Sequence, residues 1–163
     1  APVICAVNGV AAGAGASIAL ACDMVLAAES ARFIQSFSKI GLVPDAGSSW
    51  VLPRRIGMAR AMGLALTATA LSAAEAVACG LIWKSHADAA LLPAAQELTA
   101  TLASGPTTAF AATKMLMQHA ASTDFDTHLA LEASTQKSCA ESDDYSEGVE
   151  AFLQKRAAKF TGS

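Results

Sequence analysis

Charged residues are scarce in this chain of 163 residues: they make up only 15%, whereas 53% are hydrophobic and the mean hydropathy is +0.41. A soluble monomer normally needs a charged surface without large apolar patches. We expect no membrane span, because the best apolar run covers residues 11–20 and Asp23 follows soon after, whereas a span needs about 18 apolar residues or more. We therefore expect a soluble subunit whose excess apolar surface is buried against partners.

A basic block is also lacking, and the net charge is -3. Nucleic acid is therefore not an expected partner. No charged segment precedes an apolar one at the start, so no signal peptide is expected and a cytoplasmic location is favoured. The opening residues, Ala1-Pro2-Val3-Ile4, are typical of the middle of a domain. We expect a preceding N-terminal part that this chain lacks.

Paired cysteine motifs are absent as well. Cys5, Cys22, Cys79 and Cys139 show no C-x-x-C spacing, which argues against a zinc site and against a secreted disulfide scaffold. We expect no metal, and we interpret the four residues as buried, reduced thiols of a cytosolic protein.

The first third of the chain is rich in strands and punctuated by glycine. Apolar runs of strand length predict strands at residues 3–7, 24–28 and 32–34, with a small-residue loop at 11–16 and a buried helix at 17–22. Residues 41–49 contain Pro44 and Gly47 and predict a loop before a helix. We expect residues 1–68 to form the strand-containing core.

The remainder, residues 69–163, is predicted to be a helical region of the same domain. Ser72 and Glu75 form a capping box and Gly80 suits a helix end, after which residues 81–83 predict a short strand. Helices are expected at residues 56–68, 93–103, 106–120 and 125–140, and from about 142 onwards.

The glycine loop is the first candidate site. Gly13 and Gly15 precede a helix, and bare N–H groups at a helix start can bind a phosphate or stabilise an oxyanion. The spacing is not G-x-G-x-x-G, because Ile18 stands in place of the third glycine, and no Walker lysine follows. A nucleotide-binding module is therefore disfavoured, while a tight structural turn remains an alternative.

Asp45 is the second candidate. It lies between Pro44 and Ala46 in an apolar neighbourhood before a helix. It could be a simple N-cap aspartate. It could also be a general acid or base, because apolar surroundings disfavour the ionised carboxylate and move it toward useful proton transfer. The three histidines show no spacing typical of ligands or catalytic groups.

Three segments together resemble the crotonase (enoyl-CoA hydratase/isomerase) superfamily. They are residues 2–15 followed by Ala21-Cys22-Asp23, residues 41–47, and residues 147–156. The resemblance implies an α/β crotonase-like fold, a spiral of ββα repeats with a helical C-terminal trimerisation region, assembled as trimers or pairs of trimers. It also implies a CoA thioester whose carbonyl lies in a two-donor oxyanion hole, with the backbone N–H of Ala14 as one donor.

The resemblance points to the isomerase branches of the family, chiefly through residues 30–45 and 60–66. Family hydratases carry two glutamates, which align with Ser17 and Phe37 here, whereas Asp45 matches the single acid of the isomerases. Roughly the first third of a family member is absent, and with it the second oxyanion donor. The implied activity is isomerisation of an acyl-CoA, either an epoxidised phenylacetyl thioester or an enoyl-CoA double bond.

Alternatives remain open. A hydratase or dehalogenase of the same fold is one, and a truncated, inactive subunit that only oligomerises is another. In the last helix, the resemblance implies that Phe152 and Lys155 help to hold the adenine end of CoA, whereas the plain interpretation is a core phenylalanine and a solvated lysine. CoA belongs to the substrate, so no separate cofactor is expected.

Overall fold

The computed structural model describes residues 1–163 and contains two compact units. Val3–Glu97 form the first unit, and Leu98–Ser163 together with Ala1–Pro2 form the second. The boundary falls within helix α5 (Leu91–Ala103). Each unit is described by itself.

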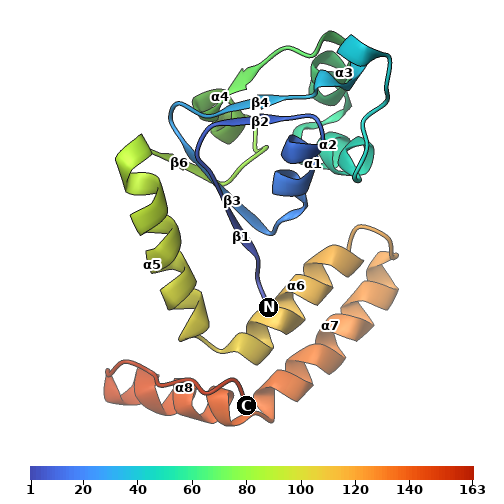
Figure 1. Cartoon of the computed structure of the whole chain (residues 1–163). Helices are drawn as coiled ribbons and strands as arrows, with labels where there is room; N and C mark the ends of the chain where they lie inside the picture. Colours follow the sequence, from blue (N-terminus) through green and yellow to red (C-terminus); the bar gives the residue numbers. More distant parts are fainter. The chain divides into compact units, whose positions relative to one another are not determined.

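Two small sheets form the framework of the first unit (Figure 1). In one sheet, β3 (Met24–Ala28) lies between β1 (Ile4–Val7) and β6 (Lys84–His86), and all pairs are parallel. In the other, β4 (Arg32–Ile34) pairs in parallel with β2 (Val10–Ala12) and antiparallel with the two-residue β5 (Leu71–Ser72). The order β1, β2, α1 (Ala14–Ala21) along the chain is one ββα repeat.

Short helices connect and cover these strands. They are η1 (Ser36–Ile40), a 3₁₀ helix, followed by α2 (Ser48–Ile56), α3 (Met58–Thr67), α4 (Ala73–Ala78) and the 3₁₀ helix η2 (Asp88–Ala90). The core is aliphatic, and its largest fully buried hydrophobic side chains are Leu20, Val25, Leu26, Leu52, Leu81 and Leu91. Burying one such side chain contributes roughly 1.5–3 kcal/mol, so this core fixes the loops at its edge.

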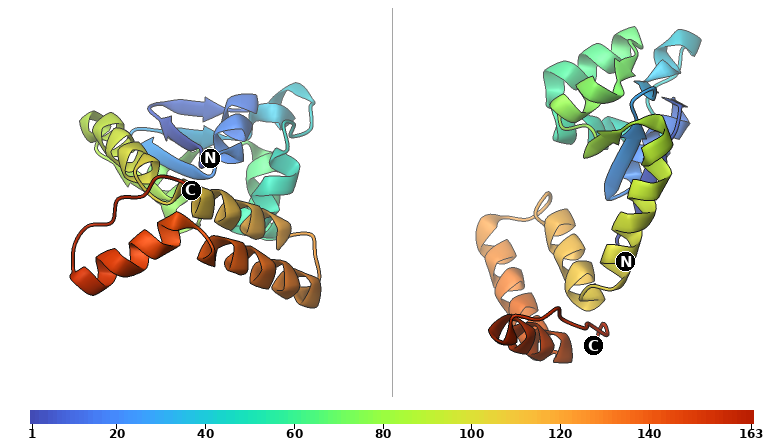
Figure 2. Two further views of the ribbon diagram at one scale, coloured as in Figure 1. Left: turned by 90° about the horizontal axis from the view of Figure 1, so that it is seen from below. Right: turned by 90° about the vertical axis from the view of Figure 1, so that its left-hand side faces the viewer.

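The second unit is helical. Helices α6 (Thr107–His119) and α7 (Phe125–Ala140) run side by side in opposite directions, and α8 (Asp143–Gln154) follows (Figures 1 and 2). The C-terminal tail returns along α8. Its path is fixed by the carboxylate of Asp144, which accepts N–H groups from Thr161 at 2.7 Å and Gly162 at 3.0 Å.

Several local predictions are confirmed. Strands β3 and β4 have the predicted bounds, and β1 lacks only Val3 of its predicted range. The capping box of Ser72 and Glu75 is present at α4. The helices expected at 125–140 and from about 142 are present as α7 and α8, which the side chains of Asp124 and Ser142 cap. Each of these features depends on residues close together in the sequence, and for that reason it could be predicted from the sequence alone.

The helix expected at 56–68 is present as α3, which begins two residues later because Gly57 adopts φ 77° between α2 and α3. Two other predictions are wrong. The strand expected at 81–83 begins only at Lys84, since the N–H groups of Leu81 and Ile82 instead close the end of α4 on the carbonyl of Ala76. The loop expected at 11–16 is divided between β2 and α1, whose first residue is Ala14.

No helix of the structure combines the length and the apolar character that crossing a membrane requires. The division of the chain at residue 68 into a spiral core and a helical region of the same domain stays a prediction.

Candidate functional site

The start of helix α1 is shaped by Gly13, its N-cap residue. Gly13 has φ 50° and ψ -126°, a conformation that only glycine adopts readily. Its N–H donates to the carbonyl of Ile34 at 2.9 Å, which ties the loop to the end of β4. Ala14 is then the first helical residue, where the backbone N–H has no acceptor one turn earlier. The arrangement leaves a donor available for an anionic oxygen.

The loop that carries Asp45 is built from two consecutive left-handed residues. Ala46 has φ 47° and Gly47 has φ 81°. The backbone carbonyl of Asp45 accepts the N–H of Ser48 at 2.9 Å, and its side chain is exposed. The N-cap of α2 is Gly47, and no side chain caps this helix. The N-cap interpretation of Asp45 is therefore wrong.

A short series of contacts connects the two loops within the first unit. Gln35 follows Ile34, the acceptor for Gly13, and is buried. The buried hydroxyl of Ser48 reaches the side-chain oxygen of Gln35 at 3.5 Å. Ser48 in turn holds the backbone of Asp45. The Ala14 amide and Asp45 are thus carried by segments that share one buried polar contact.

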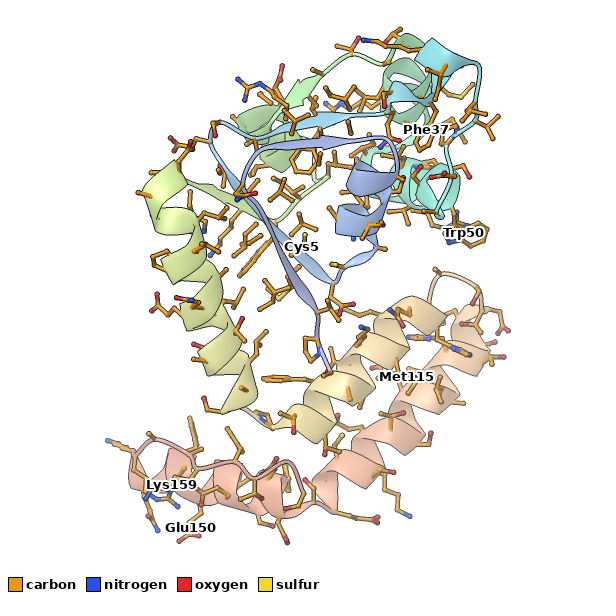
Figure 3. All side chains as sticks on the ribbon, in the orientation of Figure 1. Cys5, Phe37, Trp50, Met115, Glu150 and Lys159 are labelled. Atoms are coloured by element: carbon orange, nitrogen blue, oxygen red, sulfur yellow. The ribbon has the colours of Figure 1, made fainter.

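Two residues close to the glycine loop, Ser17 and Phe37, carry no carboxylate. Ser17 is buried, and its hydroxyl donates to the carbonyl of Gly13 at 3.2 Å. Phe37 is also buried, and its ring lies 3.8 Å from the position that a Cβ on Gly13 would occupy. Figure 3 labels Phe37 in this part of the chain. These are the two positions where the resemblance places the glutamates of hydratases.

Three other acids of the same unit have structural partners. The carboxylate of Asp23 accepts the N–H of Val3 at 2.7 Å. Hydrogen bonds from the side chain and backbone of Ser72 lower the pKa of Glu75, and those from Ser30 lower the pKa of Asp88. Each of these carboxylates stabilises a turn or a helix start. The side chain of Asp45 is exposed as theirs are, but its loop is held by backbone hydrogen bonds and not by its carboxylate.

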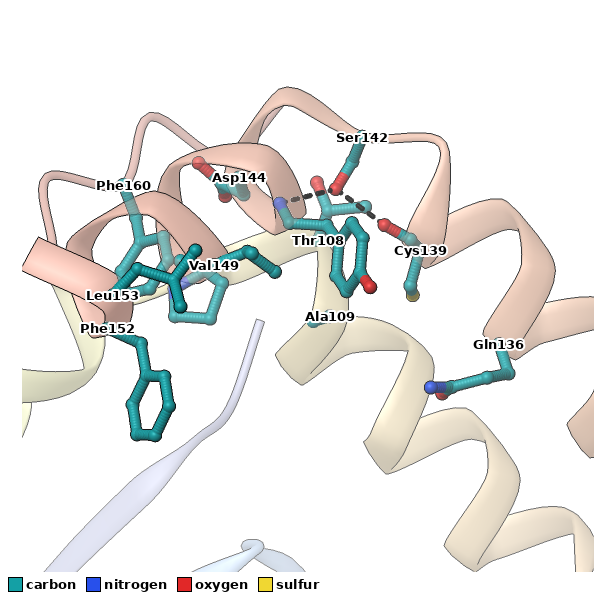
Figure 4. A pocket seen from close by; sticks show the side chains of 13 residues that line it. Thr108, Ala109, Gln136, Cys139, Ser142, Asp144, Val149, Phe152, Leu153 and Phe160 are labelled. Carbon is teal, nitrogen blue, oxygen red and sulfur yellow. Dashed lines mark hydrogen bonds between the residues drawn. The ribbon is translucent and has the colours of Figure 1, made fainter.

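Phe152 and Lys155 lie in the second unit, on α8 and at its end. Phe152 is 82% exposed and lines an apolar groove of about 480 Å³ with Val149, Leu153 and Phe160 (Figure 4). The interpretation of Phe152 as a core residue is therefore wrong for this chain. Lys155 is exposed and ends the helix in a left-handed conformation, φ 55°.

Sequence reasoning singled out Ala14, Asp45, Phe152 and Lys155. It did not identify the buried contact between Gln35 and Ser48 as part of the site. Nothing in the local pattern indicates that contact, because it depends on the residue after β4 meeting the start of α2 in the folded unit.

Comparison with known proteins places the whole chain in one family. The family model described as enoyl-CoA hydratase/isomerase matches residues 1–163. The chain is 52% identical over 161 residues to the 1,2-epoxyphenylacetyl-CoA isomerase of Escherichia coli strain K12. It is also 52% identical over 161 residues to a "probable enoyl-CoA hydratase" of Rhodobacter capsulatus. Each alignment covers 99% of this chain.

Solved structures agree on the fold. An enoyl-CoA hydratase from Polaromonas sp. JS666 is similar with a TM-score of 0.95 at 38% identity, over 98% of this chain and 62% of that one. The chain likewise spans 62% and 63% of the length of the two relatives above. The α/β crotonase-like fold is thereby confirmed. The chain belongs to the enoyl-CoA hydratase/isomerase, or crotonase, family.

Proposed function

We propose that the protein containing this chain isomerises acyl-CoA thioesters, with Asp45 as its proton-transfer group. The observation that carries the proposal is the set of side chains around the glycine loop. Ser17 and Phe37 supply no carboxylate, while Asp45 lies exposed on a loop joined to it through Gln35 and Ser48. One base is sufficient for moving a proton within the substrate, whereas the hydratase pattern uses two acids.

The names of the relatives support the proposed substrate class. The protein of Escherichia coli is named 1,2-epoxyphenylacetyl-CoA isomerase, which supports 2-(1,2-epoxy-1,2-dihydrophenyl)acetyl-CoA as a substrate. An enoyl-CoA double bond is the second candidate. Water addition is the alternative reaction, because an equally similar relative is named a probable enoyl-CoA hydratase. Residues 17 and 37 are Ser17 and Phe37 and provide no carboxylate, which disfavours water addition.

In the proposed mechanism, the thioester oxygen accepts the N–H of Ala14. A second donor would come from residues outside this chain. Asp45 removes a proton from one of the carbons C2 to C4 of the acyl group and returns it to another of these carbons. Each well-placed donor stabilises the developing oxyanion by roughly 3–4 kcal/mol, so that one base and the two donors can carry the reaction.

The adenine end of CoA is assigned to the second unit. A flat aromatic ring can pack on adenine, and an ammonium group can meet a phosphate as a point charge. The high exposure of Phe152 and the exposed position of Lys155 support this assignment, because both side chains are accessible to a ligand.

We further propose that the protein is a homo-oligomer, a trimer or a pair of trimers. Large apolar side chains lie exposed in both units, among them Ile40, Val43, Trp50, Leu66, Met117 and Phe125. Such surface is typical of protein contacts. Sedimentation at micromolar concentration should show an assembly larger than a monomer, and a well-folded monomer would contradict the proposal.

Isomerisation and hydration can be separated by mass. The full-length protein is supplied with 2-(1,2-epoxy-1,2-dihydrophenyl)acetyl-CoA, or with an enoyl-CoA, in ¹⁸O-labelled water. The proposal predicts a product with the mass of its substrate and without label. A labelled water adduct as the main product would establish a hydratase and overturn the proposal.

A further inference from the structure

A side chain from α2 holds the end of α1. Arg55, in the last turn of α2, donates from Nη2 to the carbonyl of Cys22 and from Nη1 to the carbonyl of Leu81, each at 3.0 Å. Cys22 is the C-cap residue of α1, and Leu81 comes shortly after Cys79, the C-cap residue of α4. One guanidinium group therefore joins the ends of three helices within the first unit.

Helix α1 has no cation of its own at this end. Its last turn contains no basic residue, although the last carbonyls of a helix lack partners within the helix and favour a nearby positive charge. Arg55 supplies that charge from the neighbouring helix, because a guanidinium group stays protonated in proteins. Arg55 is half-buried, and burial lowers its pKa while the charges of Cys22 and Asp23 act in the opposite direction. The thiol of Cys22 is free and half-buried, as are the other three, so the expectation of fully buried thiols is wrong.

Both helices begin at the proposed site. Ala14 is the first residue of α1, which has eight residues and is therefore about 12 Å long. Ser48 is the first residue of α2, and its N–H donates to the carbonyl of Asp45 at 2.9 Å. At these starts the two segments are joined through the contact of Gln35 with Ser48, which at 3.5 Å is long for a hydrogen bond. The shorter bonds of Arg55 hold the opposite end of α1, so a change there is transmitted along a short, rigid helix to Ala14.

We propose that Arg55 is a positioning residue for the isomerisation proposed above, on which this inference rests: its guanidinium group fixes α1 against α2 and thereby keeps the N–H of Ala14 aligned with Asp45. Arg55 acts through the two helices and not by contact with the substrate. Alignment matters because a misplacement of about 1 Å can slow a reaction on the order of 100-fold. Arginine is required because its planar fork reaches two carbonyls at once, whereas the ammonium group of lysine is a point charge.

The first test compares Arg55→Met and Arg55→Lys with the wild type in the full-length protein, at a temperature where urea unfolding shows each protein to be folded. Methionine removes every donor, and lysine keeps the charge. In Arg55→Met, kcat for isomerisation should fall by a factor of about 10 or more while KM for the thioester changes little, because alignment and not binding is lost. Arg55→Lys should lose less. Arg60→Met removes an exposed guanidinium group from α3 and is the control that should keep wild-type kcat.

The second test measures the Ala14 donor without any reaction. Butyryl-CoA labelled with ¹³C at its thioester carbonyl is saturated, so it can be neither isomerised nor hydrated. A hydrogen bond from the N–H of Ala14 weakens the carbonyl bond of the probe. Infrared difference spectra should therefore show a lower stretching frequency for the probe bound to the wild type than for the free probe. Arg55→Met should reverse part of this shift, and Arg55→Lys a smaller part.

The outcomes separate this inference from the proposed function. A wild type that does not isomerise, but whose carbonyl shift depends on Arg55, would refute the proposed function and leave the positioning role standing. A less stable Arg55→Met with wild-type kcat and wild-type carbonyl shift would overturn the inference, because Arg55 would then be a structural link only. A wild type that produces no carbonyl shift would overturn it as well. If Arg55→Met does not fold, Arg55→Lys carries the comparison, and wild-type values of kcat and of the shift in Arg55→Lys would overturn the inference.

Discussion

Replacing Gly13 by alanine tests whether the start of α1 is held in the geometry that the proposed site needs. The backbone of Gly13, at φ 50° and ψ -126°, lies in a region that L side chains rarely adopt. An added Cβ would also meet the hydroxyl of Ser36 at 3.2 Å and the ring of Phe37 at 3.8 Å. The first of these distances is too short without a small movement of Ser36.

The expected loss of stability comes from the backbone strain at position 13 and from the contact with Ser36. A residue forced into a sparsely populated backbone region costs on the order of 1–3 kcal/mol. The contact with Ser36 can relax by a few tenths of an ångström, so we expect Gly13→Ala to lower the free energy of unfolding by roughly 2 kcal/mol. If the chain instead relieves the strain by rotating the loop, the N–H of Ala14 moves and turnover falls, while stability changes less.

Urea unfolding and steady-state turnover of the full-length variant measure the two effects. Gly63→Ala is the matched control, because Gly63 lies inside α3 with nothing within 4 Å of its added Cβ. An alanine there should raise helix stability by roughly 0.5–1 kcal/mol. Wild-type stability together with wild-type turnover in Gly13→Ala would refute the reasoning, since it would show that the loop does not depend on glycine.

Three further changes test other parts of the structure. Hydrogen bonds from the side chain of Arg156, then from the N–H of Lys159, lower the pKa of Glu147 to about 2. The contribution of Glu147 to stability is therefore full above its unfolded pKa of about 4.3 and is lost as the pH falls toward 2. Glu147→Gln should remove this acid-dependent loss from unfolding curves recorded between these two pH values, and an unchanged pH profile would contradict the assignment. Ser72→Ala should cost about 1 kcal/mol in the same assay, because it removes the capping bond to the N–H of Glu75; no change would mean that the cap is not formed in solution. Lys155→Gly should stabilise the fold by about 1 kcal/mol, because the φ of 55° at this position suits glycine. The same change should weaken CoA-thioester binding, measured by calorimetry, and the loss should depend on salt. Unchanged binding at low and high salt would remove Lys155 from the CoA site.

The strands show which features could be predicted from sequence. The buried run of β3 is bounded on both sides by polar residues, so its limits are local and were predicted in full. β2 has only three residues, mixes exposed and buried positions, and is formed by pairing with β4. The break between α2 and α3 depends on the conformation of Gly57, which a glycine permits but does not require.

The candidate site shows the same division. Asp45 is a candidate from sequence because it is an acid in an apolar, proline-containing loop, but excluding the cap needed the folded start of α2, where Gly47 is the N-cap and no side chain caps the helix. The contact of Gln35 with Ser48 joins the residue after β4 to the first residue of α2, and no local sequence pattern indicates it. The exposure of Phe152 likewise depends on how α8 packs in its own unit.

The most direct test of the central claim is the turnover of Asp45→Asn in the full-length protein. Asp45 is exposed and caps no helix, so unfolding and thioester binding should remain as in the wild type. Glu29→Gln, which removes another exposed carboxylate of the same unit, is the control and should retain full activity. The account predicts that isomerase turnover of Asp45→Asn falls by a factor of about 100 or more, as expected for a lost proton-transfer group; near-normal turnover would contradict it.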